Sequence, residues 1–102
     1  MLALQEKAPQ PEKSDPQVLS ALANGTRIKI LVVLHEAGSM SFTDLMKKTG
    51  MDGPVLVHHL DKLQTAKLAV KRANPDANSA QYRLYEVTPF GEEMLRTLLI
   101  LP

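Results

Sequence analysis

The segment from residue 51 to residue 63 constrains the fold of this chain more than any other part of the sequence. Leucines occur at positions 56, 60 and 63, which are positions i, i+4 and i+7 of a helix. Residues with this spacing share one face of an α-helix, so the leucines predict a buried seam on a helix over about residues 54–66. His59 flanks the seam, and His58 points to the opposite face. The segment is therefore expected to pack on a core through one face and to expose the other.

The residues before this segment predict a second helix and a short turn. Ser41 and Asp44 form a capping box and Gly50 follows, so a helix is expected over residues 42–49. Because a residue before proline avoids helical angles, Gly53 is expected to cap the next helix, with the following proline as its first residue. Two helices joined by a three-residue turn that contains glycine form the helix-turn-helix pattern.

The N-terminal part predicts an arm and a short helix. Residues 1–13 contain two prolines and mixed charges without a period, so they are expected to be a disordered arm before a folded domain of residues 14–102. Asp15 and Pro16 predict the start of a short helix that ends at Ala23. Its core face is expected to consist of Val18, Leu19 and Leu22.

A longer helix, from Thr26 to Ala37, is apolar on nearly every side and is therefore expected at the centre of the domain. Gly38 is expected to end it in a left-handed conformation. His35 lies one turn beyond Leu31 on the buried side, which predicts a hydrogen-bonded core histidine in preference to a ligand.

The C-terminal part predicts a hairpin and a closing helix. Residues 68–71 and 81–87 alternate in polarity, and residues 74–79 between them are turn formers, so two strands are expected. Thr88 and a following proline predict the start of a last helix over about residues 89–101. Its apolar residues exceed what one core can bury, so a homodimer is expected. The predicted dimer interface consists of Met94, Leu95, Leu98, Leu99, Ile100 and Leu101.

Length and composition fit one small domain and exclude several classes of protein. Without cysteine there is no disulfide and no thiolate metal site, and neither a metal nor another cofactor is expected. No apolar run approaches the ~20 residues that span a bilayer and no signal-peptide core occurs, so a soluble, cytoplasmic chain without a membrane partner is expected. The net charge of +1 identifies no partner. Residues 17–88, however, hold nine Lys/Arg and six Asp/Glu, an excess of +3 that permits a phosphate-binding face.

Four short segments carry a resemblance to a known family. They are ANGTRIKIL at 23–31, FTDL at 42–45, HHLDKL at 58–63 and YEVTPFG at 85–91. With these segments in this order, the chain from Leu22 to Leu95 resembles the arsenic-repressor-like (ArsR-type) family of prokaryotic transcription regulators. The resemblance implies a winged helix-turn-helix, mostly α with a small two-stranded β wing and a C-terminal helix used for dimerisation. It also implies a dimer that places one recognition helix per subunit in successive major grooves, with the wings alongside.

The sequence departs from this family at three places. The positions that the resemblance assigns to DNA usually hold Ser, Thr or Gln, and here they are Gly53, Pro54, Val55, Val57 and His58. Ala66-Lys67-Leu68 stands where Ala-Gly-Leu is expected, which leaves open whether the recognition helix runs on. The cysteine sensor sites of the metal-responsive members are missing, and the resemblance does not identify a small-molecule inducer.

The sequence thus predicts a transcription regulator that prefers certain sequences of double-stranded DNA. The helix over residues 54–66 is expected in the major groove, and the wing over residues 68–87 on the backbone or the minor groove. Val55 and Val57 are expected to touch thymine methyl groups, and His58 to make the polar base contact. The predicted DNA-binding residues are Ser41, Thr43, Lys47, Gly53, Pro54, Val55, Val57, His58, Lys62, Lys71, Arg72, Asn78 and Arg83. Each basic residue among them is equally well explained as solvated surface, but together they carry the charge excess.

Two other kinds of function compete with DNA binding. An exposed face of Pro54, Val55 and Val57 would also suit a winged helix that binds another protein. An enzyme is not expected, because the sequence has no nucleophile elbow, no phosphate-binding glycine loop and no metal-ligand spacing. His58 points about 100° away from the histidine that follows it, so the two cannot share a metal ion. A site between subunits that pairs His58 or His35 with a carboxylate stays open.

Overall fold

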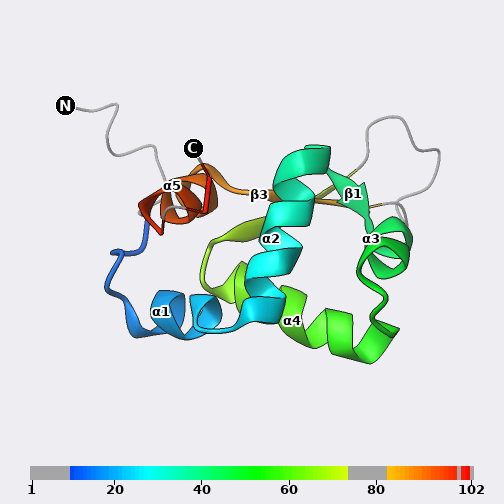
Figure 1. Cartoon of the computed structure of the whole chain (residues 1–102), viewed down its shortest axis with the longest axis horizontal. Helices are drawn as coiled ribbons and strands as arrows, with labels where there is room; N and C mark the ends of the chain where they lie inside the picture. The colour runs from blue at the N-terminus through cyan, green and yellow to red at the C-terminus, as the bar shows by residue number, and fades with distance from the viewer. Residues whose placement is uncertain (1–9, 74–82, 99, 102) are drawn as a thin grey trace.

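Five helices and three short strands make up the described part of the chain, which in the computed structural model is residues 10–73, 83–98, 100 and 101. The helices are α1 (Pro16–Leu22), α2 (Gly25–Ala37), α3 (Phe42–Thr49), α4 (Gly53–Thr65) and α5 (Pro89–Thr97). The strands are β1 (Met40–Ser41), β2 (Ala69–Ala73) and β3 (Arg83–Val87). Helix α2 lies in the middle, with α1 and α5 toward one end of the molecule and α3 toward the other (Figure 1).

The strands form one antiparallel sheet in the order β1-β3-β2. Tyr85 of β3 pairs with Met40 of β1 on one side and with Lys71 of β2 on the other. The predicted winged helix-turn-helix fold is confirmed, and β1 adds a third strand to the two that were predicted. A strand of two residues is too short to show an alternation, and Ser41 is extended partly because it also caps α3.

The core confirms the leucine seam of α4. Leu56, Leu60 and Leu63 are at most 1% exposed, and they belong to the same buried cluster as Ile30 of α2 and Leu45 of α3. Burying one leucine contributes about 2 kcal/mol, so the seam is a major part of what holds α4 on the core.

Helix α5 rests against the start of the wing because one of its positions is glycine. A Cβ atom on Gly91 would overlap the carbonyl oxygen of Leu68 and a methyl group of Val87. Thr88 accepts the N–H of Gly91 at 2.9 Å and donates its hydroxyl to the carbonyl of Lys67 at 2.6 Å. This close approach joins α5 to the residues that connect α4 to β2.

The ends of the helices mostly follow the sequence. The side chains of Asp15, Ser41 and Thr88 accept backbone N–H groups at the starts of α1, α3 and α5, as predicted. Gly38 and Gly50 end α2 and α3 with positive φ angles of 84° and 76°. Glycine adopts such angles without the steric cost that a Cβ atom brings.

The predicted cap of α4 is wrong. Asp52 caps this helix by accepting the N–H of Val55 at 3.3 Å, and Gly53 is its first residue. Proline restricts the preceding residue partly through that residue's Cβ atom, which glycine lacks. Gly53 can therefore be helical although Pro54 follows it.

Two side chains predicted to lie in the core are exposed. Leu19 is 51% exposed because it lies about 100° around α1 from Val18, outside the narrow face that this seven-residue helix buries. That buried face consists of Val18, Ala21 and Leu22. His35 lies at the surface in the last turn of α2, beyond the reach of the core. Its Nδ1 atom is 2.8 Å and 2.9 Å from the two carboxylate oxygens of Glu92, so His35 contacts α5 instead.

The last helix is shorter than predicted. Helix α5 ends at Thr97 and is capped by Leu98, whereas the sequence predicted a helix to about residue 101. The chain then turns back, so that the N–H of Ile100 bonds to the carbonyl of Leu95 at 3.0 Å. Ile100 and Leu101, which were expected on the helix as part of the dimer surface, thus lie beyond its end.

The apolar residues near the C-terminus divide into two groups. Met94 and Leu95 are at most 3% exposed in the core of the chain itself, so they do not contribute to an apolar surplus. Leu98 and Ile100 are 44% and 38% exposed, and Leu101 is half-buried. Leu99 lies outside the described residues. Among the described residues of the predicted interface, Leu98 and Ile100 are therefore the exposed ones.

Strand β2 does not alternate as predicted. Leu68 and Ala69 are both buried, and Lys71 and Arg72 are both exposed. Leu68 precedes the strand and closes the end of α4, where its N–H bonds to the carbonyl of Leu63 at 2.9 Å. Residues 74–82, which include the predicted turn and Asn78, lie outside the described residues.

The last residue of the predicted arm contacts the folded domain. The ammonium group of Lys13 lies 3.0 Å from a carboxylate oxygen of Glu93 on α5, so the end of the predicted arm contacts the domain. Residues 1–9 lie outside the described residues. Across the described ranges, no single helix is long and apolar enough to cross a membrane; α1 and α2 qualify only as a pair, and they meet at 85°.

Candidate nucleic-acid interface

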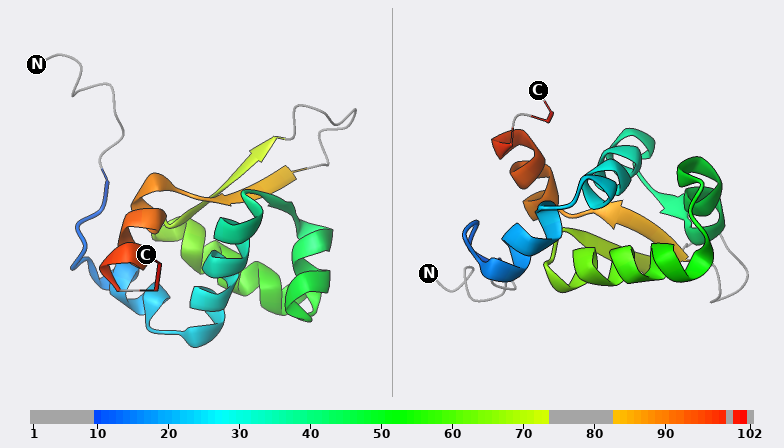
Figure 2. Two further views of the ribbon diagram at one scale, coloured as in Figure 1. Left: turned by 45° about the horizontal axis from the view of Figure 1, so that its top comes forward. Right: turned by 60° about the horizontal axis from the view of Figure 1, so that its bottom comes forward.

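One face of α4 is covered by no described helix or strand (Figure 2, right). We call this the outer face of α4; its exposed residues are Pro54, Val55, Val57, His58, Asp61 and Lys62. Val55 and Val57 are each 45% exposed, whereas Gly53 is half-buried. The helical phase predicted from the leucine seam is confirmed, because the seam is buried and the opposite residues are exposed.

Helix α3 meets α4 at the turn that joins them and presents candidate phosphate-binding groups (Figure 2). Thr43 and Lys47 are exposed. The hydroxyl oxygen of Ser41 accepts the N–H of Asp44 at 3.1 Å, so part of its bonding capacity is already used. A serine hydroxyl that accepts one hydrogen bond can still donate its proton to a phosphate oxygen.

The wing supplies three exposed cations among the described residues: Lys71, Arg72 and Arg83. The ammonium group of Lys71 lies 6.0 Å from the centre of the Tyr85 ring, at the outer limit of a cation–π contact. Arg72 is already paired, with its Nε atom 3.1 Å from a carboxylate oxygen of Glu86. Arg72 therefore carries less free positive charge than the sequence suggested.

Tyr85 connects the wing electrostatically to the outer face of α4. Burial raises the pKa of the Tyr85 hydroxyl, and the negative charge of Asp61 raises it further. Asp61 thus acts on the ring that lies beneath Lys71.

Comparison with protein families identifies the segment that contains α3 and α4 of this interface. Residues 24–70 match the family described as bacterial regulatory protein, arsR family. This segment is an ArsR-type helix-turn-helix. The resemblance predicted from the sequence is confirmed, and the fold is the winged helix of DNA-binding transcription regulators.

Individual proteins are also similar to the chain in sequence or structure. The chain is 32% identical over 87 residues to a putative arsenical resistance operon repressor ArsR of Halobacterium salinarum, covering 84% of this chain and 64% of that protein. It superimposes with a TM-score of 0.64 on the transcriptional regulator HlyU from Vibrio vulnificus, with 27% identity and 81% of each chain covered. A mutant of MarR from E. coli, complexed with operator DNA, gives a TM-score of 0.68 at 24% identity, covering 78% of this chain and 56% of that one. The chain spans 43% and 64% of the lengths of the curated relatives it matches.

Arg27 is the residue of the ArsR-type motif whose role the sequence did not indicate. Its side chain is only 8% exposed, although it carries a full charge. Its Nε atom donates to the carbonyl of Ala21 at 2.9 Å, and a terminal nitrogen donates to the carbonyl of Ser20 at 3.2 Å. The other terminal nitrogen lies 3.1 Å from Nδ1 of His59. Arg27 therefore ties the end of α1 to α4. The available signal was an arginine in the first turn of an otherwise apolar helix.

This contact fixes the chemical state of His59. An arginine can only donate, so Nδ1 of His59 must accept and the histidine must be neutral. Burial lowers the pKa of His59 below its ordinary value, and the positive charges of Arg27 and His58 lower it further. His58, on the outer face, is exposed and its ring lies 5.5 Å from that of His59, centre to centre. Two adjacent histidines thus serve different surfaces.

Among the described residues, no group of three or more histidine, aspartate or glutamate side chains is placed to hold a metal ion. His35 pairs with Glu92 of the same chain, which is one of the histidine–carboxylate pairings that the sequence left open between subunits. That pairing joins α2 to α5 and needs no second copy.

Proposed function

We propose that this chain regulates transcription by binding double-stranded DNA as a homodimer, with α4 of each copy in a major groove. The observation that carries the proposal is the division of α4: its leucine seam is buried, and its outer face is free to enter a groove. The match to the arsR family supports the same reading. A recognition helix needs an anchored inner face so that its outer residues are held in register with the bases.

The outer face of α4 suits modest sequence preference. His58 is the polar side chain best placed to reach a base edge, and Val55 and Val57 offer methyl contacts to thymine. A bidentate contact discriminates by roughly 1–3 kcal/mol per base, and a methyl contact by less. We therefore propose that much of the preference comes from DNA shape and that the wing contacts the backbone or the minor groove.

The exposed apolar residues at one end of the molecule suit a dimer contact. Leu19 of α1 and Leu98 and Ile100 after α5 are each at least 38% exposed, and α1 and α5 lie toward the same end (Figures 1 and 2). Leu19 extends the interface predicted from the sequence, while Met94 and Leu95 leave it. Replacing Leu98 and Ile100 together with Glu should give monomers by sedimentation; a wild-type chain that is monomeric at high micromolar concentration would exclude this interface.

Selection of bound sequences from a random DNA pool, followed by fluorescence anisotropy over a range of salt concentrations, tests the DNA proposal. Affinity should fall steeply with salt, because cations on the protein displace the counterions of phosphate. Lys71→Ala should weaken binding to all sequences alike and reduce the salt slope by about one. Lys29→Ala, an exposed lysine outside the proposed interface, is the matched control and should leave the slope unchanged. No enrichment and no binding at low salt would overturn the proposal.

A protein-binding function is the second candidate, and the exposure of Val55 and Val57 favours it. Unpaired apolar side chains on a helix suit a partner's apolar surface. A complex of this kind depends little on salt. Binding that survives high salt and is lost in Val57→Ser would favour the protein partner over DNA.

A further inference from the structure

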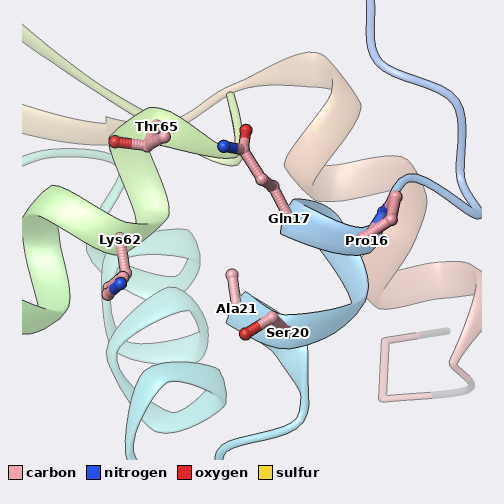
Figure 3. A pocket seen from close by; sticks show the side chains of 6 residues that line it. All are labelled: Pro16, Gln17, Ser20, Ala21, Lys62 and Thr65. Atoms are coloured by element: carbon pink, nitrogen blue, oxygen red, sulfur yellow. The ribbon is translucent and has the colours of Figure 1, made fainter.

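A hollow of about 210 Å³ lies between α1 and the end of α4 (Figure 3). Six residues line it: Pro16, Gln17, Ser20, Ala21, Lys62 and Thr65. Their spacing shows that each helix contributes one face, since residues three and four apart in α1 and three apart in α4 are neighbours. In Figure 3 the Gln17 side chain extends toward the end of α4. The hollow is therefore formed by the packing of the two helices and not by a single loop.

The side chains around the hollow favour a small anion. Lys62 is exposed and forms no ion pair with a described residue. Ser20 adds a hydroxyl group and Gln17 an amide, whereas the Thr65 hydroxyl points away from α1 (Figure 3). None of the lining residues is acidic. Hydroxyl, amide and ammonium groups can all donate hydrogen bonds. A ligand that accepts several hydrogen bonds and carries a negative charge matches this set.

The apolar floor and the volume of the hollow restrict further the kind of ligand that fits. Ala21 is 2% exposed and forms an apolar floor together with the ring of Pro16. The volume of about 210 Å³ is below the roughly 300–1,000 Å³ of pockets that hold drug-sized ligands, so the hollow suits a smaller molecule. A carboxylate with a short apolar chain has this size and this combination of ends. Inorganic phosphate has the charge but no apolar part for the floor.

The hollow is connected to the outer face of α4 in two ways. Lys62 lines the hollow and is also exposed on the outer face, where it is a proposed phosphate contact. The carbonyl groups of Ser20 and Ala21 hold Arg27, which contacts His59 of α4. A ligand in the hollow would thus touch the wall that anchors α4 and neutralise one of its cations.

We propose that this hollow binds a small carboxylate, and that the bound carboxylate competes with DNA phosphate for Lys62. The competition rests on the proposed DNA-binding function, whereas the ligand site does not. Because binding coupling is reciprocal, DNA lowers the affinity for the carboxylate by the same factor as the carboxylate lowers the affinity for DNA.

Titration of the full chain with butanoate, followed by amide NMR and without DNA, tests the site. Saturable shifts are expected at the amides of residues 17, 20, 21, 62 and 65. The neutral analogue butanamide and the variant Lys62→Met, which keeps the apolar stem, should each bind about tenfold more weakly. Lys47→Met is the matched control because Lys47 is exposed but does not line the hollow. Equal binding of inorganic phosphate, or shifts spread over other surface lysines, would overturn the site.

Ser20→Leu separates the site from the DNA interface. The larger side chain fills the hollow, while the Ser20 carbonyl that holds Arg27 stays in place. This variant should lose butanoate binding and keep the wild-type affinity for DNA. At constant ionic strength, butanoate should weaken DNA binding of the wild type and not of Ser20→Leu; equal weakening of both would overturn the competition. If the wild type binds butanoate but no DNA, the proposed function fails and the ligand site stands.

Discussion

The two faces of α4 differ in what constrains them. Leu60 on the inner face is 1% exposed, and Val57, one turn earlier on the outer face, is 45% exposed. Packing against the core accounts for every leucine of the seam, and nothing in the described chain accounts for the valines. The neighbours His58 and His59 lie on either side of this division. Residues on the inner face therefore report on folding, and residues on the outer face report on a partner.

The largest expected effect is the loss of a seam leucine. Leu60→Ala should lower the free energy of unfolding by about 3 kcal/mol, because it removes buried methyl groups and leaves a cavity. Val57→Ala, the matched change on the outer face, should stay within about 0.5 kcal/mol of the wild type. Urea denaturation at one fixed protein concentration measures both, since dimerisation makes stability depend on concentration. A large loss in Val57→Ala would show that the outer face is packed in the folded protein.

The next largest effect on stability is expected at Arg27, which joins α1 to α4. Arg27→Met should cost about 2 kcal/mol, because the buried carbonyl of Ala21 and the partly buried carbonyl of Ser20 lose their donor while the apolar stem is largely preserved. Arg72→Met is the control, since Arg72 is exposed and should change stability by no more than about 0.5 kcal/mol. Thermal unfolding of the two variants compares them directly. Equal stability of Arg27→Met and the wild type would mean that water replaces the guanidinium without cost.

Arg27 also shows where prediction from sequence stops. Periodicity predicts the leucine seam and the phase of α4 because both depend only on local helix geometry. It predicts the caps at Asp15 and Ser41 for the same reason. The link from Arg27 to His59 spans 32 residues, and no local pattern contains it. Strand β1 is missed because its pairing with β3, Met40 with Tyr85, is even more distant in sequence.

The errors at the ends of the chain have a second cause. Hydrophobic pattern shows that Leu19 and Leu98 are apolar, but it cannot show how far the core extends around them. Helix α1 has only seven residues, and the chain turns back after α5, so both leucines lie beyond the core. The prediction for His35 is wrong for the same reason, because it lies beyond the core at the end of α2. For the interface, the sequence predicted which residues of α4 are exposed, while their role in binding DNA remains a prediction.

A smaller effect on stability is expected at the C-terminal end of α4. Lys67 follows the helix with a φ angle of +64°, the left-handed region in which a Cβ atom is strained. Lys67→Gly should raise the free energy of unfolding by about 1 kcal/mol and leave both faces unchanged. Gly50→Ala is the reverse control at the end of α3, where φ is +76° and space is open, and should lose a similar amount. A change in DNA affinity in Lys67→Gly would show that the outer face depends on how α4 ends.

The smallest expected effect is on the pH dependence of stability, to which His59 and His58 should contribute differently. The pKa of His59 is lowered in the folded chain by burial, by Arg27 and by His58, in decreasing order. The unfolded chain then binds the proton more readily than the folded chain, so acid favours unfolding. The contribution of neutral His59 is complete above its ordinary pKa of 6.5 and is lost as the pH falls through the lowered value.

Melting temperatures measured between pH 7.5 and 5 should therefore fall more in the wild type than in His59→Gln, which has no proton to take up there. His58→Gln is the matched control and should keep most of the pH dependence, because burial and Arg27 outweigh His58 as causes. For DNA binding, His58→Gln should have the larger effect of the two variants, since His58 is the proposed base contact. Its loss should relax the base preference at one position per half-site. If His58→Gln abolishes the pH dependence of melting and His59→Gln alters only base preference, the assignment of the two faces of α4 is wrong.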